Sequence, residues 1–314
     1  MQAPNPSPLD SARERFRADL VDAGLLIPTA VPGLYGRSGV LESIIDAVDA
    51  RIRRAGAGAH GSTARVLRFP PVYPREAFDR TDYIASFPNL TGSVATFRGD
   101  DRAHAELLAT RAEGGDWDHF LEPAGTMLVS AACHPAYPTL TGTLPEEGAL
   151  LDVYGYCFRH EPAIDPARLQ AFRMHEFVRV GTPEQARAHR ESWLPRALSV
   201  LTELGLDAVA APANDPFFGR AGRMLASNQR TAELKTELLV RLYGDLDEGT
   251  AVVSCNSHQD HFGSAFGIDT ADGAVAHSAC VGFGMERIAL AMLRTHGLSV
   301  EHWPAPQRAL LAVG

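Results

Sequence analysis

The sequence predicts an α+β fold in which an antiparallel β-sheet is flanked by helices. Strand-like segments concentrate in the middle of the chain, and helix-like segments lie toward both ends. Few strand–helix–strand alternations of the kind that builds a doubly wound sheet are present. With 314 residues, 45% of them hydrophobic, the chain can bury a large core as one large domain or two ordinary ones.

Four segments have the pattern of helices. Residues 11–26 form the first, ending near Gly24 and Pro28, and residues 184–205 form a later one. Residues 284–295 follow a glycine-rich turn and make the last predicted helix. Residues 39–54 carry apolar side chains at helical spacing, which predicts one buried face. These side chains are Val40, Ile44, Ile45, Val48 and Ile52.

The strand-like segments lie between these helices. Segment 65–69 is stopped by two prolines, Pro70 and Pro71. Segments 150–160 and 170–180 flank Glu161-Pro-Ala-Ile-Asp-Pro, whose prolines exclude regular pairing, so we predict a hairpin with a long, structured tip. Two further strand-like segments are residues 231–243 and 250–254.

Composition limits the class of partner and the compartment. The net charge of −9, from 29 basic and 38 acidic residues, makes a long polyanion a less favoured partner because phosphate contacts usually leave a basic footprint. The four cysteines are too few and too dispersed for a disulfide scaffold. No run of about 18 apolar residues and no secretory signal pattern are found, so we expect a cytoplasmic protein without membrane contact.

The first chemically informative motif is Arg159-His-Glu161, followed by Arg168. Two residues that are two apart on a strand point to the same face. An arginine there can bind phosphate oxygens through its planar donors, and the glutamate can accept from an adenine amine or an ammonium group. The alternative is a solvated arginine–glutamate pair on the surface of the hairpin.

The second motif is Gly282-Phe-Gly284-Met-Glu286-Arg287 before an apolar helix. Its glycines allow close backbone approach to a ligand at a helix N-terminus, where Arg287 could meet phosphate oxygens. Glycines before a helix can also mark only a tight turn.

Together the two motifs resemble motifs two and three of class II aminoacyl-tRNA synthetases. The helix 39–54, the strand after it and the paired prolines resemble motif one, which forms the dimer interface in that family. Several segments resemble a seryl-tRNA synthetase core in particular, and the similarity runs from about residue 30 to residue 295. They are Arg65-Val-Leu-Arg-Phe-Pro-Pro, Thr81-Asp-Tyr-Ile-Ala-Ser-Phe-Pro88, Phe158-Arg159-His-Glu161, Arg173-Met-His-Glu-Phe177 and Ser254-Cys-Asn-Ser-His-Gln-Asp260.

The resemblance implies a zinc site. Archaeal-type seryl-tRNA synthetases carry a Cys, Glu, Cys set at the positions of Cys133, Glu176 and Cys280, where the metal takes the amino group of the substrate. Two thiolates and a carboxylate are suitable zinc ligands and leave a coordination position open. Buried packing is the alternative for any cysteine in an apolar segment, and we prefer it for Cys157 and Cys255.

The resemblance also implies roles around ATP. Arg159 and Arg287 are the expected catalytic residues holding the triphosphate, with Arg168 closing from the loop. Phe177 is expected to stack on adenine and Glu161 to accept from its amine. The remaining expected ATP-binding residues are Leu169, Ala251, Val252, Val253 and Ser254, and the expected substrate residues are Glu176, Lys235, Glu237 and Asn256. Alanine at 251 departs from the family, which usually has a metal-binding glutamate there, so the number of Mg²⁺ ions bound with ATP is not predicted. For Lys235 and Glu237 an exposed charge pair is the alternative.

The predicted acceptor of the activated amino acid follows from the short segment that precedes the catalytic core. Only about 30 residues do so, which we expect to be a tail and first helix (1–30) before a catalytic domain (31–314) without a separate tRNA-binding domain. Such a chain resembles the amino acid:[carrier protein] ligases. These form an aminoacyl adenylate from glycine or alanine and pass it to the phosphopantetheine thiol of a carrier protein. The resemblance therefore predicts ATP, a small amino acid and a carrier as partners, a homodimer, and no tRNA.

Alternative functions remain at this stage. An atypical aminoacyl-tRNA ligase could recruit tRNA by another surface, and a catalytically dead paralogue could act as a binding module. A purely structural zinc is a third alternative. A local basic run at Arg220, Arg223 and Arg230 could steer an acidic carrier or could simply be solvated.

Overall fold

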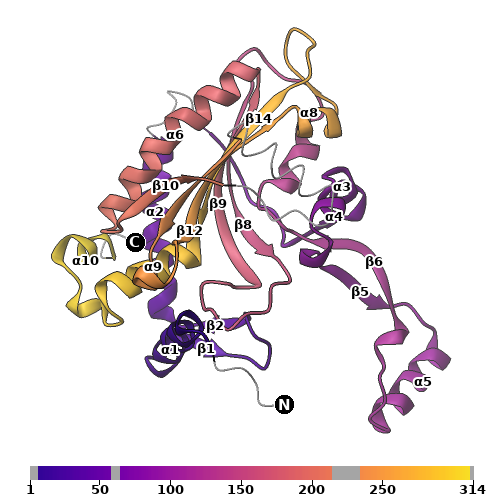
Figure 1. Cartoon of the computed structure of the whole chain (residues 1–314). Coiled ribbons are helices and arrows are strands. Elements are labelled where there is room, and N and C mark those ends of the chain that lie inside the picture. The colour runs from indigo at the N-terminus through magenta and orange to yellow at the C-terminus, as the bar shows by residue number, and fades with distance from the viewer. Residues whose placement is uncertain (1–5, 58–63, 214–233, 312–314) are drawn as a thin grey trace.

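A seven-stranded sheet forms the centre of the computed structural model, which describes residues 6–57, 64–213 and 234–311 (Figure 1). Its strand order is β10-β11-β12-β14-β9-β8-β3. All neighbouring strands are antiparallel except β3 and β8, which are parallel. The strands are β3 (Arg65–Leu67), β8 (Ala149–Phe158), β9 (Ala171–Gly181), β10 (Ala208–Pro212), β11 (Lys235–Val240), β12 (Thr250–Gln259) and β14 (His277–Gly284). The predicted antiparallel sheet is confirmed.

Three long helices cover one face of this sheet (Figure 1). They are α2 (Gly39–Ala57), α6 (Pro183–Glu203) and α9 (Met285–His296), with α1 (Pro8–Asp22) and α10 (Ala305–Leu311) beside them. Helix α6 begins with a capping box, because the Thr182 hydroxyl accepts from the Gln185 N–H and the Gln185 side chain accepts from the Thr182 N–H. The apolar stripe predicted for α2 is buried, apart from Val40, which is 50% exposed.

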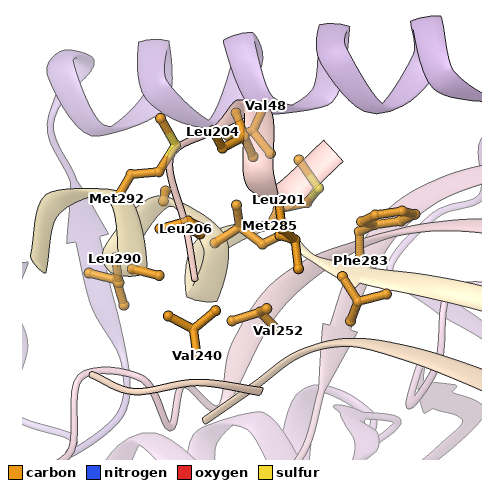
Figure 2. Packing of buried hydrophobic residues seen from close by; sticks show 14 of the residues in the cluster. Val48, Leu201, Leu204, Leu206, Val240, Val252, Phe283, Met285, Leu290 and Met292 are labelled. Carbon is orange, nitrogen blue, oxygen red and sulfur yellow. The ribbon is translucent and has the colours of Figure 1, made fainter. Parts of the chain in front are cut away.

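The larger hydrophobic core lies between these helices and the sheet. Figure 2 shows part of it, with Val48 of α2, Leu201 of α6 and Phe283 of β14 in one cluster. Phe16 and Leu20 of α1 belong to the same core, so the N-terminal helix packs against the rest of the chain. The division at residue 30 stays a prediction.

Smaller elements cover part of the opposite face. A three-stranded sheet has the order β4-β6-β5, and its distal end with α5 extends away from the body (Figure 1). These elements are β4 (Val72–Pro74), α3 (Arg75–Arg80), α4 (Tyr83–Ser86), β5 (Ser93–Phe97), α5 (Asp101–Ala112), β6 (Leu121–Leu128) and α8 (His261–Phe266). The described residues also form two short strand pairs: β1 (Leu26–Pro28) with β2 (Tyr35–Arg37), and β7 (Gly142–Thr143) with β13 (Ile268–Asp269). Short 3₁₀ helices lie at Pro88–Leu90, Asp118–Phe120, His134–Leu140, Gly244–Leu246 and Val300–His302.

The β8–β9 hairpin has the predicted strands but not the predicted end. Strand β8 stops at Phe158, so Arg159 and Glu161 lie beyond it rather than on one strand. The backbone N–H of Phe158 donates to the Val129 carbonyl and that of His160 to the Leu90 carbonyl, while that of Arg159 still donates to the Gln170 carbonyl, so backbone hydrogen bonds hold the chain past the end of β8. No helix in the described ranges is both long and apolar enough to cross a bilayer.

Candidate active site

One cleft of about 760 Å³ lies on the sheet face opposite the larger hydrophobic core, and Glu286 and Arg287 at the start of α9 line part of it. Residues of four neighbouring strands, β11, β12, β14 and β9, form its floor, and those of β9 and β14 alternate because side chains along a strand point alternately to the two faces. Strand β9 contributes Phe172, Met174 and Glu176, and β14 contributes Cys280 and Gly282. All but one of the predicted site residues line this cleft. They are Cys133, Arg159, Glu161, Arg168, Leu169, Glu176, Lys235, Glu237, Ala251, Val252, Val253, Ser254, Asn256, Cys280 and Arg287.

The exception is Phe177, and its predicted contact with adenine is wrong. Its side chain is only 3% exposed and faces the helices, one position out of step with Glu176. The ring stacks on Trp193 with centroids 4.6 Å apart and packs so closely on α2 that a Cβ at Gly56 would lie 2.3 Å from it. Phe172 is the aromatic ring of this strand that reaches the cleft. The alternation of β9 could have indicated this, since Phe172 and Glu176 are four residues apart and share a face.

Three arginines gather at one end of the cleft. The Arg159 guanidinium lies 5.4 Å from the centroid of Phe172, and its Nε donates to the Ser130 carbonyl over 3.1 Å. Arg168 contacts the Glu161 carboxylate at 3.4 Å. Burial, and then the like charges of Arg159 and Arg168, lower the pKa of Arg287. A guanidinium stays charged at neutral pH, so this end of the cleft favours an anion.

Backbone carbonyls fix the direction of Arg287. Its Nε donates to the Ala167 carbonyl over 2.8 Å, and its Nη1 donates to the Ala251 carbonyl over 3.1 Å. The arginine therefore links the hairpin tip to the first residues of β12. Its orientation is set before any ligand is bound.

A second group of polar side chains lies on the β11 and β12 floor of the cleft. Lys235 and Glu237 share one face of β11, as predicted, and their charged atoms are 3.1 Å apart. Lys235 is the cross-strand partner of Asn256, and Glu237 is that of Ser254. Ammonium, carboxylate, amide and hydroxyl groups thus line the same cleft as the arginines.

The three predicted zinc ligands come together from distant segments. Cys133, Glu176 and Cys280 are 3%, 2% and 4% exposed and line the same part of the cleft. One oxygen of Glu176 accepts from the Ala132 N–H over 2.9 Å. Cys280 Sγ lies 3.4 Å from Asn256 Nδ2 and 3.6 Å from His258 Nε2.

The electrostatics of this group follow from burial and mutual contact. The hydrogen bond between the two thiol groups, then burial and the charge of Glu176, raise the pKa of Cys133, while the same hydrogen bond lowers that of Cys280. Burial and the neighbouring Cys280 raise the pKa of Glu176 to about 7. Burial therefore favours the protonated forms of Cys133 and Glu176, and a bound cation would compensate the charge of their ionised forms.

The chemical types of these three side chains therefore suit zinc, but their spacing does not form a preformed metal site. In the described part of the chain, no group of three or more His, Cys, Asp and Glu side chains is arranged to hold a metal ion. Two thiols and a carboxylate still match the chemistry of a zinc centre with an open position. Zinc stays a proposal for these residues.

Sequence reasoning missed two residues that contact predicted ones. These residues are Phe172 and His258. The Nε2 atom of His258 lies close to Cys280 Sγ, and its Nδ1 atom lies 3.0 Å from the Ser278 hydroxyl. His258 lies within the quoted Ser254–Asp260 segment, but only the pairing of β12 with β14 brings it to the cysteine. The basic run of Arg220, Arg223 and Arg230 lies outside the described residues.

The fold is that of a class II aminoacyl-tRNA synthetase catalytic core. M. kandleri SerRS, solved in complex with A. aeolicus tRNASec, superposes with a TM-score of 0.79 at 20% identity over 100% of this chain. The cytoplasmic serine–tRNA ligase of Naegleria fowleri superposes with a TM-score of 0.67 at 14% identity over 95% of this chain. The chain spans 63% and 59% of these two proteins, and at such identities the likeness shows the fold alone.

Sequence relatives define the family more narrowly. Two proteins of Bradyrhizobium diazoefficiens named amino acid–[acyl-carrier-protein] ligase 2 and 1 are 43% and 42% identical over 90% of this chain, covering 84% and 85% of their own length. A type-2 serine–tRNA ligase of Methanopyrus kandleri is 28% identical over 76% of this chain and 49% of its own. No family model matches the sequence. The chain belongs to the amino acid–[acyl-carrier-protein] ligase family, as predicted.

Proposed function

We propose that this chain activates a small amino acid with ATP and transfers it to the phosphopantetheine thiol of a carrier protein. Glycine is the proposed substrate, with alanine as the next choice. The observation that supports this most is that one cleft joins three arginines to a buried thiol–carboxylate group. The arginines suit a triphosphate, and the thiol–carboxylate group suits the amine of an amino acid.

In the proposed first step, a carboxylate oxygen of the amino acid attacks the α-phosphorus and pyrophosphate leaves. Arg159 and Arg287 would hold the triphosphate, and Arg168 would close from the hairpin tip. Fixed cations placed where negative charge develops lower the barrier without reorganising during the reaction. Glu161 would accept from the adenine amine, and Phe172 would provide the stacking surface in place of Phe177.

In the proposed second step, the carrier thiol attacks the carbonyl carbon of the adenylate, and AMP and a proton are released. No protein nucleophile is required, so the task of the chain is to orient and to exclude water. Lys235, Glu237 and Asn256 lie where they could contact the substrate, because they line the β11 and β12 side of the same cleft.

Two metals belong to this proposal. Held by Cys133, Glu176 and Cys280, Zn²⁺ would take the unprotonated amine of the substrate and so orient its carboxylate. Mg²⁺ would accompany ATP and offset the charge of the leaving pyrophosphate. Ala251 offers that ion no carboxylate.

A homodimer is also part of the proposal. Strand β3 is the edge of the central sheet, and Val66 on it is 59% exposed. An apolar residue on an exposed sheet edge favours association. A monomer by light scattering across the working concentration range would contradict this.

The decisive test is amino-acid-dependent ATP–pyrophosphate exchange with each of the twenty amino acids, with and without a zinc chelator. We expect chelator-sensitive exchange with glycine or alanine, and a loss of about 100-fold or more in Arg159→Ala and Arg287→Ala. No exchange with any amino acid, in protein shown to contain zinc, would overturn the catalytic proposal. Mass spectrometry of a phosphopantetheinylated carrier, beside charging of bulk tRNA, then distinguishes the acceptors.

A further inference from the structure

The tip of the β8–β9 hairpin contains a turn whose local chemistry is clear from the sequence. Asp165-Pro166-Ala167-Arg168 has aspartate and proline at the first two positions of a tight turn. The Arg168 N–H donates to the Asp165 carbonyl over 3.0 Å, and the Ala167 N–H donates to the Asp165 carboxylate over 2.9 Å. The second bond is an Asx turn, which aspartate forms within its own segment.

Two distant residues hold this turn in place. The Tyr243 hydroxyl donates to Asp165 Oδ1 over 2.6 Å, and Arg13 Nε of helix α1 forms an ion pair with Asp165 Oδ2 at 3.1 Å. The Arg13 guanidinium also lies 5.8 Å from the centroid of the Tyr243 ring. Asp165 is only 6% exposed, so its carboxylate is buried and fully engaged by an amide, a phenol and a guanidinium.

The N-terminal segment holds the same loop at a second point. Gln170, which is 2% exposed, donates from its backbone N–H to the Gly33 carbonyl over 2.9 Å and from its side chain to the Pro32 carbonyl over 2.7 Å. Gly33 has a φ of +79°, and a Cβ there would lie 3.2 Å from the Arg168 carbonyl oxygen. Figure 1 shows the hairpin tip descending toward α1, β1 and β2.

These anchors act on the arginine end of the cleft. The Ala167 carbonyl, inside the anchored turn, accepts from Arg287, and Arg168 follows directly in the chain. Arg13 and Asp165 themselves line the cleft. A displaced turn would therefore remove one of the two carbonyls that orient Arg287 and would move Arg168.

We propose that α1 and the segment around Gly33 are part of the nucleotide-binding lobe, with Arg13, Tyr243 and Asp165 as positioning residues for loop 161–170. This inference rests on the proposed function, because ATP is the ligand that the ordered loop would bind. A loop ordered before binding avoids the entropic cost of ordering it on binding, so the anchors strengthen ATP binding without touching the amino acid.

The experiment compares Arg13→Met, Tyr243→Phe and the matched control Arg15→Met, a change of an exposed arginine on the same helix. Hydrogen exchange of peptides covering 161–170 is measured without nucleotide, and KM values for ATP and for the amino acid are measured separately. We expect lost protection of the loop and a KM for ATP raised roughly tenfold in both anchor variants, the factor for about one charged hydrogen bond. The KM for the amino acid and the control should stay unchanged.

Each outcome decides a separate point. Unchanged loop protection in Tyr243→Phe, which keeps the ring and loses only the hydroxyl, would overturn the anchoring even if Arg13→Met folds poorly. Lost protection with an unchanged KM for ATP would overturn the role in nucleotide binding. A wild-type protein with no ATP-dependent exchange would refute the proposed function instead, and the hydrogen-exchange comparison would still test the anchoring. Partial rescue by Arg13→Lys is expected, because lysine restores the charge but not the planar guanidinium.

Discussion

A buried charge cluster behind the cleft gives a prediction whose size can be derived from the structure. It consists of Arg37, Glu42, Arg173 and Glu286, two cations and two anions on four different elements. The Glu286 carboxylate accepts from the Arg173 N–H over 2.7 Å and from its Nε over 2.8 Å. Arg173 reaches Glu42 of α2 through its two remaining nitrogens over 2.7 and 3.1 Å. The side chains of Arg173 and Glu286 are 8% and 2% exposed.

The perturbation is Glu286→Gln. It removes one of two negative charges from a set of four in which Arg173 and Glu286 are buried and Glu42 is partly exposed, and it turns an acceptor oxygen into an amide that can face the Arg173 donors. Removing one partner of a buried pair costs about 3–5 kcal/mol. Glu42 still compensates Arg173 and is partly solvated, so we expect the lower end, about 3 kcal/mol. With about 2.1 cal/mol/K of unfolding entropy per residue, this lowers the Tm of a 314-residue chain by roughly 4–5 °C.

The assay is thermal unfolding by circular dichroism, with urea unfolding for the free energy. The control is Glu203→Gln, because Glu203 pairs with Arg51 but its side chain is 47% exposed. A solvated pair contributes only about 0–1 kcal/mol, so its Tm should hardly change. Equal, small shifts in both variants would refute the reasoning that burial makes the Glu286 pair important.

Three further predictions concern single residues. Phe172→Ala should raise the KM for ATP with little loss of stability, whereas Phe177→Ala should cost about 3–5 kcal/mol in urea unfolding; similar results for the two would contradict the assignment of faces on β9. Cys280→Ala should lose bound zinc, measured by metal analysis, together with adenylate formation; a zinc-free variant that still forms adenylate would remove the metal from the proposal. Burial alone would lower the pKa of His175, but hydrogen bonds to Asp152 and Asp49 raise it. Its contribution to stability should be complete below about pH 6.5 and be lost as the pH rises through the folded-state pKa. Urea midpoints of wild type and His175→Gln that fall in parallel would show that His175 does not cause this pH dependence, and a difference that widens as the pH rises would show the sign to be wrong.

The sequence by itself determined the family and several local elements, but it did not predict α5, β6, β10 or β14. Apolar spacing predicted α2, and prolines around residues 161–166 predicted the break between β8 and β9, because helix periodicity and proline geometry act within a few residues. The motifs around Arg159 and Arg287 were sufficient to predict the family. They could do so because close relatives share short, ordered patterns of residues.

Tertiary structure decided which of these residues meet. Cys133 and Cys280 lie far apart in the chain, and only the sheet register brings Cys280 beside Glu176. The choice of Phe172 over Phe177 depended on which face of β9 the helices cover, and a shift of one residue exchanges the two faces. The contact of Arg13 with Asp165 had no sequence signal, because a buried ion pair between distant segments depends on how the whole chain packs. The sequence therefore determined the family and many of the elements, whereas packing against the helices decided the faces, the partners and the shape of the cleft.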